Sequence, residues 1–184
     1  MLEQMVRFFI SAFNFPGLSW SLILLAIAIG LAFGAIWLTP YWPPLSKRPW
    51  LWAVATVSAF LTWTAIAFTQ IPLQSWAGQA LLHFWDQSTL TQWLLLAGIP
   101  QTLLSGLIQE GSKLVPVVFY WWRNHWNLTP KFGLIAGAAA GAGFGLFEAV
   151  WVHNSIFASG WTLQAVETSG VLALLGFWER FFSL

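Results

Sequence analysis

The chain contains no cysteine and few charged residues. None of its 184 residues is cysteine, which excludes a disulfide framework, a thiolate nucleophile and a cysteine-ligated zinc site. Only 7% of the residues are Asp, Glu, Lys or Arg, against about 25% in a typical soluble domain. The 7 basic and 6 acidic residues give a formal net charge of +1. Because no basic stripe is available to neutralise phosphates, the sequence excludes a nucleic-acid partner.

Apolar and aromatic residues take the place of the missing charges. They make up 58% of the chain, and the mean hydropathy is +0.70. The 15 tryptophans and 16 phenylalanines supply rings of the kind that gather at membrane–water interfaces. A soluble protein of this size could not cover so much apolar surface. We therefore expect residues 1–184 to form a single membrane domain in contact with the lipid bilayer.

Uncharged stretches of roughly 20 residues, the length that crosses a bilayer, mark the expected membrane segments. They predict an all-α polytopic transmembrane helix bundle with about five membrane segments and additional interfacial helices. The expected spans lie near residues 18–38, 50–68, 91–122, 132–157 and 169–184, the last of them incomplete. Interfacial helices are expected at 1–16 and 74–88, and a connector at 161–168.

Prolines define two details of these helices. The second span is expected to stop at Pro72, because proline interrupts helical hydrogen bonding. The third segment holds Pro100 and Pro116 and is expected to be one kinked helix.

The distribution of Lys and Arg predicts the orientation in the membrane. Lys47, Arg48, Arg123 and Lys131 fall in loops on one side, and Arg7 alone falls on the other. The positive-inside rule places the four cations in the cytoplasm. We expect a multi-pass protein of the cell membrane with its N-terminus outside.

A glycine pattern accompanies the fourth span. Glycine recurs every four residues, at positions 133, 137, 141 and 145. Such a face predicts close packing against a neighbouring helix, as small residues allow in lipid. Gly143 and Gly145 lie nearer to Glu148, where a second use is open: they could keep side chains away from a substrate backbone.

Ionisable residues inside membrane segments are costly and are candidates for function. Glu110 and Lys113 are three residues apart, so they share a helix face and can pair. Glu148 has no basic neighbour within a turn and needs a partner from another helix. We expect both carboxylates to face the bundle interior. A carboxylate held there can act as general base towards water, or can bind a metal together with a histidine.

The adjacent residues Glu179 and Arg180 also need partners. Their side chains leave a helix about a hundred degrees apart, so we expect no tight pair between them. The predicted partners are Glu148 for Arg180 and Lys113 for Glu179. His153 is expected to be an interfacial residue near the outer end of its span, without a catalytic role.

Two motifs resemble those of a known family. The run Gln109-Glu110-Gly111-Ser112-Lys113 resembles the EExxK element of PrsW-type intramembrane proteases, and the run from Phe144 to Glu148 resembles their FxxxE element. The glycine-rich run before Glu148 is also similar. The related families are the CAAX-prenyl endopeptidases and the YhfC family. The likeness covers roughly residues 106–184.

The resemblance implies a function and assigns roles. Members are multi-spanning bacterial or archaeal membrane proteins that cut membrane-tethered protein substrates, which here implies a bacterial plasma membrane. General-base or metal-ligand roles fall on Glu110 and Glu148, and a catalytic supporting role falls on Lys113. The other supporting candidates are Gln109, Phe144, Gly145, Glu179 and Arg180.

Two departures from the family pattern bear on activity. Gln109 stands where the family has the first glutamate of a pair. The family also has a histidine on a later helix, after a segment like residues 178–182, whereas this sequence ends at Leu184. We therefore expect a C-terminally truncated chain that is inactive as given, and zinc binding only in the full-length protein. Three alternatives stay open: a membrane scaffold, a pseudoprotease, and a small transporter with a polar Glu/Lys path, although no internal repeat supports the last.

Overall fold

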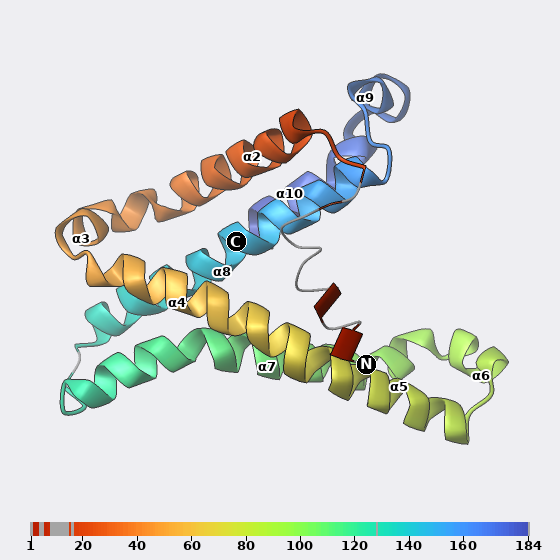
Figure 1. Ribbon diagram of the computed structural model, residues 1–184, viewed down its shortest axis with the longest axis horizontal. Coiled ribbons are helices and arrows are strands. Elements are labelled where there is room, and N and C mark those ends of the chain that lie inside the picture. The colour runs from red at the N-terminus through yellow and green to blue at the C-terminus, as the bar shows by residue number, and fades with distance from the viewer. Residues whose placement is uncertain (1, 4–5, 8–14, 16, 128, 184) are drawn as a thin grey trace.

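The protein is an elongated bundle of helices (Figure 1). The computed structural model describes all residues except 1, 4–5, 8–14, 16, 128 and 184. Among the described residues the elements are helical and no strand occurs, which confirms the all-α prediction. In chain order they are α2 (Trp20–Leu38), η1 (Thr39–Tyr41), α3 (Trp42–Lys47), α4 (Trp50–Ala65), η2 (Ile66–Gln70), α5 (Ile71–Phe84), α6 (Gln87–Gln92), α7 (Leu94–Arg123), α8 (Pro130–Ala158), α9 (Leu163–Ser169), η3 (Gly170–Leu174) and α10 (Leu175–Ser183).

Three helical stretches are long and apolar enough to cross a membrane. They are Trp20–Lys47, Trp50–Phe84 and Pro130–Ala158, and they contain the predicted first, second and fourth spans. The third predicted segment forms α7, one continuous helix of 30 residues that includes Pro100 and Pro116. The segment predicted as an incomplete last span forms η3 and α10, and the predicted connector contains the short helix α9.

The second span does not stop at Pro72, so that prediction is wrong. Helix α4 continues through η2, a single π-helical turn, into α5. Pro72 is the second residue of α5 and comes just after the π-helical turn, where the hydrogen-bond pattern of the helix already changes. The wider π-helical turn of η2, just before Pro72, lets the helix continue past the proline. Residues 74–84 of the predicted interfacial helix therefore continue the helix of the second predicted span, and residues 87 and 88 begin α6.

One prediction concerns the N-terminal end of the chain. The interfacial helix expected at 1–16 lies largely outside the described residues. At the start of α6, Asp86 caps the helix by accepting a hydrogen bond of 2.8 Å from the backbone N–H of Thr89. Hydrogen bonds from Thr89 and Ser88 hold the pKa of Asp86 below its ordinary value.

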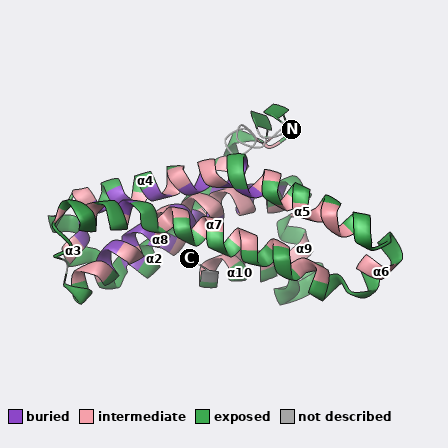
Figure 2. Ribbon diagram, turned by 90° about the horizontal axis from the view of Figure 1, so that it is seen from below, coloured by how far each residue is buried: buried purple, intermediate pink, exposed green. Residues whose placement is uncertain are grey.

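Helix α8 is the centre of the bundle, with α2, α4, α7 and α10 packed on it. Figure 2 shows the buried residues concentrated where these helices meet. One core cluster joins Leu38, Leu45 and Leu51 to Ile135 and the alanines of α8. A second joins Trp63 and Ile66 to Phe144.

The glycine face of α8 packs differently from the prediction. A Cβ at Gly133, Gly137 or Gly141 would meet no atom within 4 Å, so these glycines face open space among the described residues. The close approach lies instead at Gly143, where a Cβ would collide with the backbone of Ala55 on α4. Gly143 therefore brings two helices together, and the expectation that it leaves room for a substrate is wrong.

This contrast gives a matched pair of substitutions on one helix. Gly143→Ala should lower the free energy of unfolding by about 1–3 kcal/mol, because α4 and α8 must separate to admit the methyl group. Gly141→Ala should leave stability unchanged or raise it by up to about 1 kcal/mol, because alanine is the better helix former. Thermal unfolding of the two variants in the same detergent measures both effects. Equal losses in the two variants would contradict this packing of α8.

Candidate active site

Glu110 and Lys113 form an ion pair on α7. The Lys113 Nζ lies 2.7 Å from Glu110 Oε1, as their three-residue spacing predicts. The Glu110 side chain is 67% exposed, whereas that of Lys113 is 18% exposed. The expectation that Glu110 faces the bundle interior is therefore wrong. A lysine can bury its aliphatic chain and keep its ammonium group near the surface. The Lys113 ammonium group therefore meets the exposed Glu110 carboxylate at the surface of the bundle.

Lys113 connects this pair to α8. Its Nζ lies 5.0 Å from the centroid of the Phe144 ring, within the range of a cation–π contact. Phe144 is buried, with 1% of its surface exposed, so the ring offers the ammonium group a fixed platform. The α7 backbone is held at the same level by Ser58 of α4, whose hydroxyl donates to the Lys113 carbonyl at 3.3 Å.

Glu148 lies one turn after Phe144 on α8 and is half-buried. Its Oε1 lies 3.3 Å from Arg180 Nη1 on α10. The Arg180 guanidinium also reaches Glu179, with Nη2 at 2.5 Å from Glu179 Oε1. Arg180 therefore bridges two carboxylates, one from each helix.

The predicted partnerships are confirmed in one case only. The pair of Arg180 with Glu148 forms as expected. The pair of Lys113 with Glu179 does not form within the described part of the chain. Lys113 pairs with Glu110 instead, and Glu179 pairs with Arg180. The expectation that Glu179 and Arg180 cannot pair tightly is wrong, because the long arginine side chain spans the angle between adjacent helix positions.

An open strip of α8 leads to Glu148. Gly141 precedes Glu148 by seven residues, or two helical turns, so the two positions share a face. Gly137 lies on the same face, and a Cβ at either glycine would meet nothing within 4 Å. Gly145, which the sequence also marked, is buried. The face that carries Glu148 is thus accessible to another backbone at its glycine end.

Gln109 points to a different part of the bundle from Glu110. Its amide nitrogen donates to Gln70 Oε1 at 3.1 Å and to Ser105 Oγ at 3.0 Å. Gln74 and Gln101 extend this amide network with two reciprocal hydrogen bonds of 3.0 Å between α5 and α7. Gln109 therefore fastens α7 to the rod formed by α4, η2 and α5.

His153 is fully buried, so its prediction as an interfacial residue is wrong. The ring stacks on Phe177 with centroids 5.0 Å apart and meets the edge of Phe33 at 5.6 Å. Both ring nitrogens are buried, and the adjacent Asn154 is also buried. His153 is seven residues after Leu146, so the two share the face of α8 that packs on α2. Periodicity alone could not show that α2 covers this face.

The described residues do not assemble a site that fits a catalytic zinc ion. Such a site uses three protein ligands and a water, and no group of three His, Cys, Asp or Glu side chains comes together in the described part of the chain. Glu110 and Glu148, the predicted ligands, are each engaged by their own cation. This donor set supports carboxylate chemistry and supplies no metal-bound step.

Comparison with known proteins identifies the family. A search of curated proteins and a search of solved structures each found no match. The model of one family, described as PrsW family intramembrane metalloprotease, matches residues 47–177. The match includes both motifs, from Gln109 to Lys113 and from Phe144 to Glu148, and covers well over half of the chain. The chain therefore belongs to the PrsW family of intramembrane metalloproteases.

Proposed function

We propose that this membrane protein cleaves membrane-tethered proteins with an activated water, and that Glu110 and Glu148 carry the reaction. The observation that supports the proposal is the arrangement of two ion-paired carboxylates on neighbouring helices. The Glu110–Lys113 pair on α7 meets α8 at Phe144, one turn before the Glu148–Arg180 pair. Both carboxylates occupy the positions that match the family's motifs.

The exposed Glu110 is the general base in this proposal. It takes a proton from a water molecule while the water oxygen bonds to the carbonyl carbon of the scissile peptide. The carbon–nitrogen bond then breaks, and the departing amine receives the proton that Glu110 took from the water. Lys113 offsets the charge of Glu110, which lowers the cost of keeping a carboxylate at membrane depth. Glu148, held in place by Arg180, stabilises the site next to the reacting water.

The substrate would approach along the open glycine face of α8. Gly137 and Gly141 have no neighbour within 4 Å of a Cβ position, so an unwound substrate segment can come close to the helix there. Its backbone would reach Glu148 two turns later. A soluble peptide would lack the membrane anchor that brings the scissile bond to this depth.

The pseudoprotease alternative was prompted by Gln109. In the structure this side chain lies in the amide network with Gln70 and Ser105, away from the Glu110–Lys113 pair. A glutamine there serves helix packing, so its presence is compatible with catalysis by Glu110. For the protein expressed from its natural gene we accordingly favour an active enzyme over a pseudoprotease, in the bacterial plasma membrane and with the N-terminus outside.

The catalytic proposal predicts the effect of two isosteric substitutions. Glu110→Gln and Glu148→Gln should each reduce cleavage of a membrane-tethered reporter by at least about 100-fold, because glutamine keeps the shape but cannot accept the proton or pair with the cation. The assay uses cells that express the protein from its natural gene, with a reporter that carries one membrane anchor. Glu167→Gln, an exposed carboxylate on α9, is the control and should cleave normally.

Folding must be measured beside activity in these variants. The folded fraction after extraction in mild detergent should stay close to that of the parent protein. Normal cleavage by both folded variants would refute the assigned roles, and cleavage of the same sequence as a soluble peptide at an equal rate would refute the substrate class.

The position of Gln109 generates a separate prediction. Gln109→Glu should lower the free energy of unfolding by about 1 kcal/mol, because a carboxylate cannot donate to Gln70 or Ser105. It should not increase proteolysis, although it restores the family's glutamate pair. Gln87→Glu, at the exposed start of α6, is the matched control. A gain in cleavage for Gln109→Glu would show that the first glutamate belongs to the active site.

A further inference from the structure

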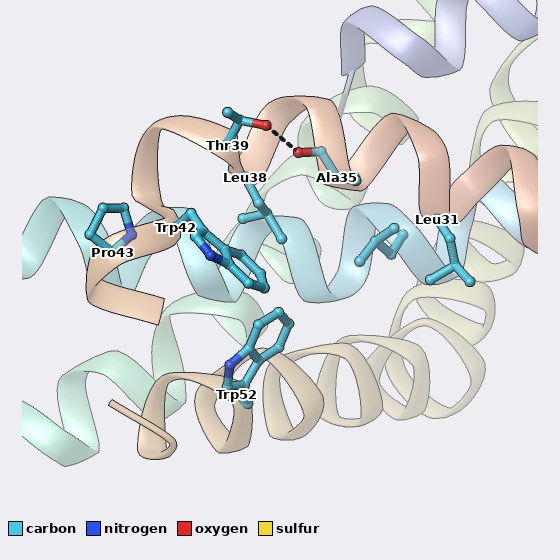
Figure 3. Close-up of a pocket in the computed structure, with 9 residues that line it drawn as sticks. Leu31, Ala35, Leu38, Thr39, Trp42, Pro43 and Trp52 are labelled. Atoms are coloured by element: carbon cyan, nitrogen blue, oxygen red, sulfur yellow. Dashed lines mark hydrogen bonds between the residues drawn. The ribbon is translucent and has the colours of Figure 1, made fainter. Parts of the chain in front are cut away.

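An apolar groove lies between α2 and α4, away from the carboxylates (Figure 3). It has a volume of about 580 Å³, within the usual range for pockets that hold small ligands. Its walls come from α2, α3 and α4, and its floor is Leu146 of α8. The lining residues are Leu31, Gly34, Ala35, Leu38, Thr39, Trp42, Pro43, Trp52 and Leu146.

The groove exists because α2 packs against α8 rather than against α4. Gly34 lacks a side chain, and a Cβ there would collide with Leu146, so α2 seats directly on α8 at this level. Ala35 beside it leaves room on the side that faces α4. Figure 1 shows α2 and α4 diverging from the turn that contains α3.

Two of the polar side chains that line the groove are satisfied within the protein. Thr39 Oγ1 donates to the Ala35 carbonyl at 2.7 Å, and Trp52 Nε1 donates to the Leu45 carbonyl at 3.1 Å. These groups are therefore not free donors for a polar ligand. A saturated or unsaturated hydrocarbon chain is the ligand chemistry that fits such walls.

Two cations follow soon after Trp42 and Pro43 in the chain, and neither is itself a lining residue of the groove. Lys47 lies four residues after Pro43 on α3, about 5–6 Å away on the same helix face, and Arg48 follows it. Both are exposed, and neither forms an ion pair with a carboxylate in the described part of the chain. Arg48 is anchored over the Phe132 ring, with its Cζ 4.4 Å from the centroid.

We propose that this groove is a binding site for an anionic phospholipid, with an acyl chain between α2 and α4 and the phosphate at Lys47 and Arg48. The exposed Trp42, with 58% of its surface accessible, lies at the depth of the glycerol backbone, where tryptophan is favoured. The site combines an apolar wall with two unpaired cations, and a membrane lipid of negative charge carries the complementary groups. A zwitterionic lipid with the same chains offers no net charge to the cations.

The test uses dioleoyl phosphatidylglycerol and dioleoyl phosphatidylcholine, which share their acyl chains. Each lipid is titrated into the detergent-purified chain, and native mass spectrometry counts the bound molecules. We expect one phosphatidylglycerol to bind at least about tenfold more tightly than phosphatidylcholine, since each cation near an anionic lipid contributes about a factor of five.

Two variants and two controls separate the parts of the site. Ala35→Phe fills the groove and should abolish selective binding, whereas Ala32→Phe, at an exposed alanine of α2 outside the groove, should not. Replacing Lys47 and Arg48 by glutamine should remove the preference for phosphatidylglycerol. The same replacement of Arg123, at the end of α7, and Lys131, at the start of α8, should leave it intact.

Several outcomes would overturn the proposal. Equal affinity for the two lipids would show that Lys47 and Arg48 do not bind the lipid phosphate. Selective binding that survives Ala35→Phe would place the lipid elsewhere, and equal loss in both pairs of cation variants would show a general surface charge effect. Because none of these residues takes part in the proposed reaction, proteolysis and lipid binding can fail independently.

Discussion

A charged side chain at membrane depth needs an opposite charge close to it, and this requirement organises the bundle. Helices satisfy their own backbone hydrogen bonds, so helical backbone can cross lipid without help. Carboxylates and guanidinium groups cannot satisfy themselves in the same way. Arg180 therefore ties α10 to α8 through Glu148, and Lys113 ties the Glu110 pair to α8 through the Phe144 ring. The two runs that resemble the family's motifs lie at these two junctions.

Two glycines allow the close helix contacts that complete the arrangement. Gly143 admits the backbone of α4, and Gly34 admits Leu146 against α2. An amide hydrogen bond then fixes α7, because Gln109 donates to Gln70 in the rod formed by α4, η2 and α5. Each junction uses a different interaction, and together they leave the glycine face before Glu148 open.

Those features of the fold and the site that depend on residues close together in the chain could be predicted from the sequence. Apolar runs between charged or proline-rich turns predicted the three apolar helices, and spacing predicted the Glu110–Lys113 pair. The absence of a local partner predicted that Glu148 and Arg180 would meet. These inferences need only helix periodicity and the cost of an unpaired charge in lipid.

Most of the predictions that were wrong concern the rotation of each helix about its own axis, which decides which face a neighbouring helix covers. Periodicity groups Gly133, Gly137 and Gly141 on one face, but it cannot say which face a neighbour covers, and the neighbour lies at Gly143 instead. The exposure of Glu110 and the burial of His153 depend on the same rotation. The continuation of the second span past Pro72 depends on one π-helical turn, whose wide geometry leaves no clear mark in the sequence.

The pair of Glu148 with Arg180 is the central claim, and a double-mutant cycle tests it most directly. Glu148→Gln and Arg180→Met are made singly and together, and the free energy of unfolding is measured in one detergent. Each single variant should lose about 1 kcal/mol or more, because it leaves a half-buried charge without its partner. The double variant should lose clearly less than the sum of the two. Additive losses would show that the two side chains do not interact, and would contradict this account of the site.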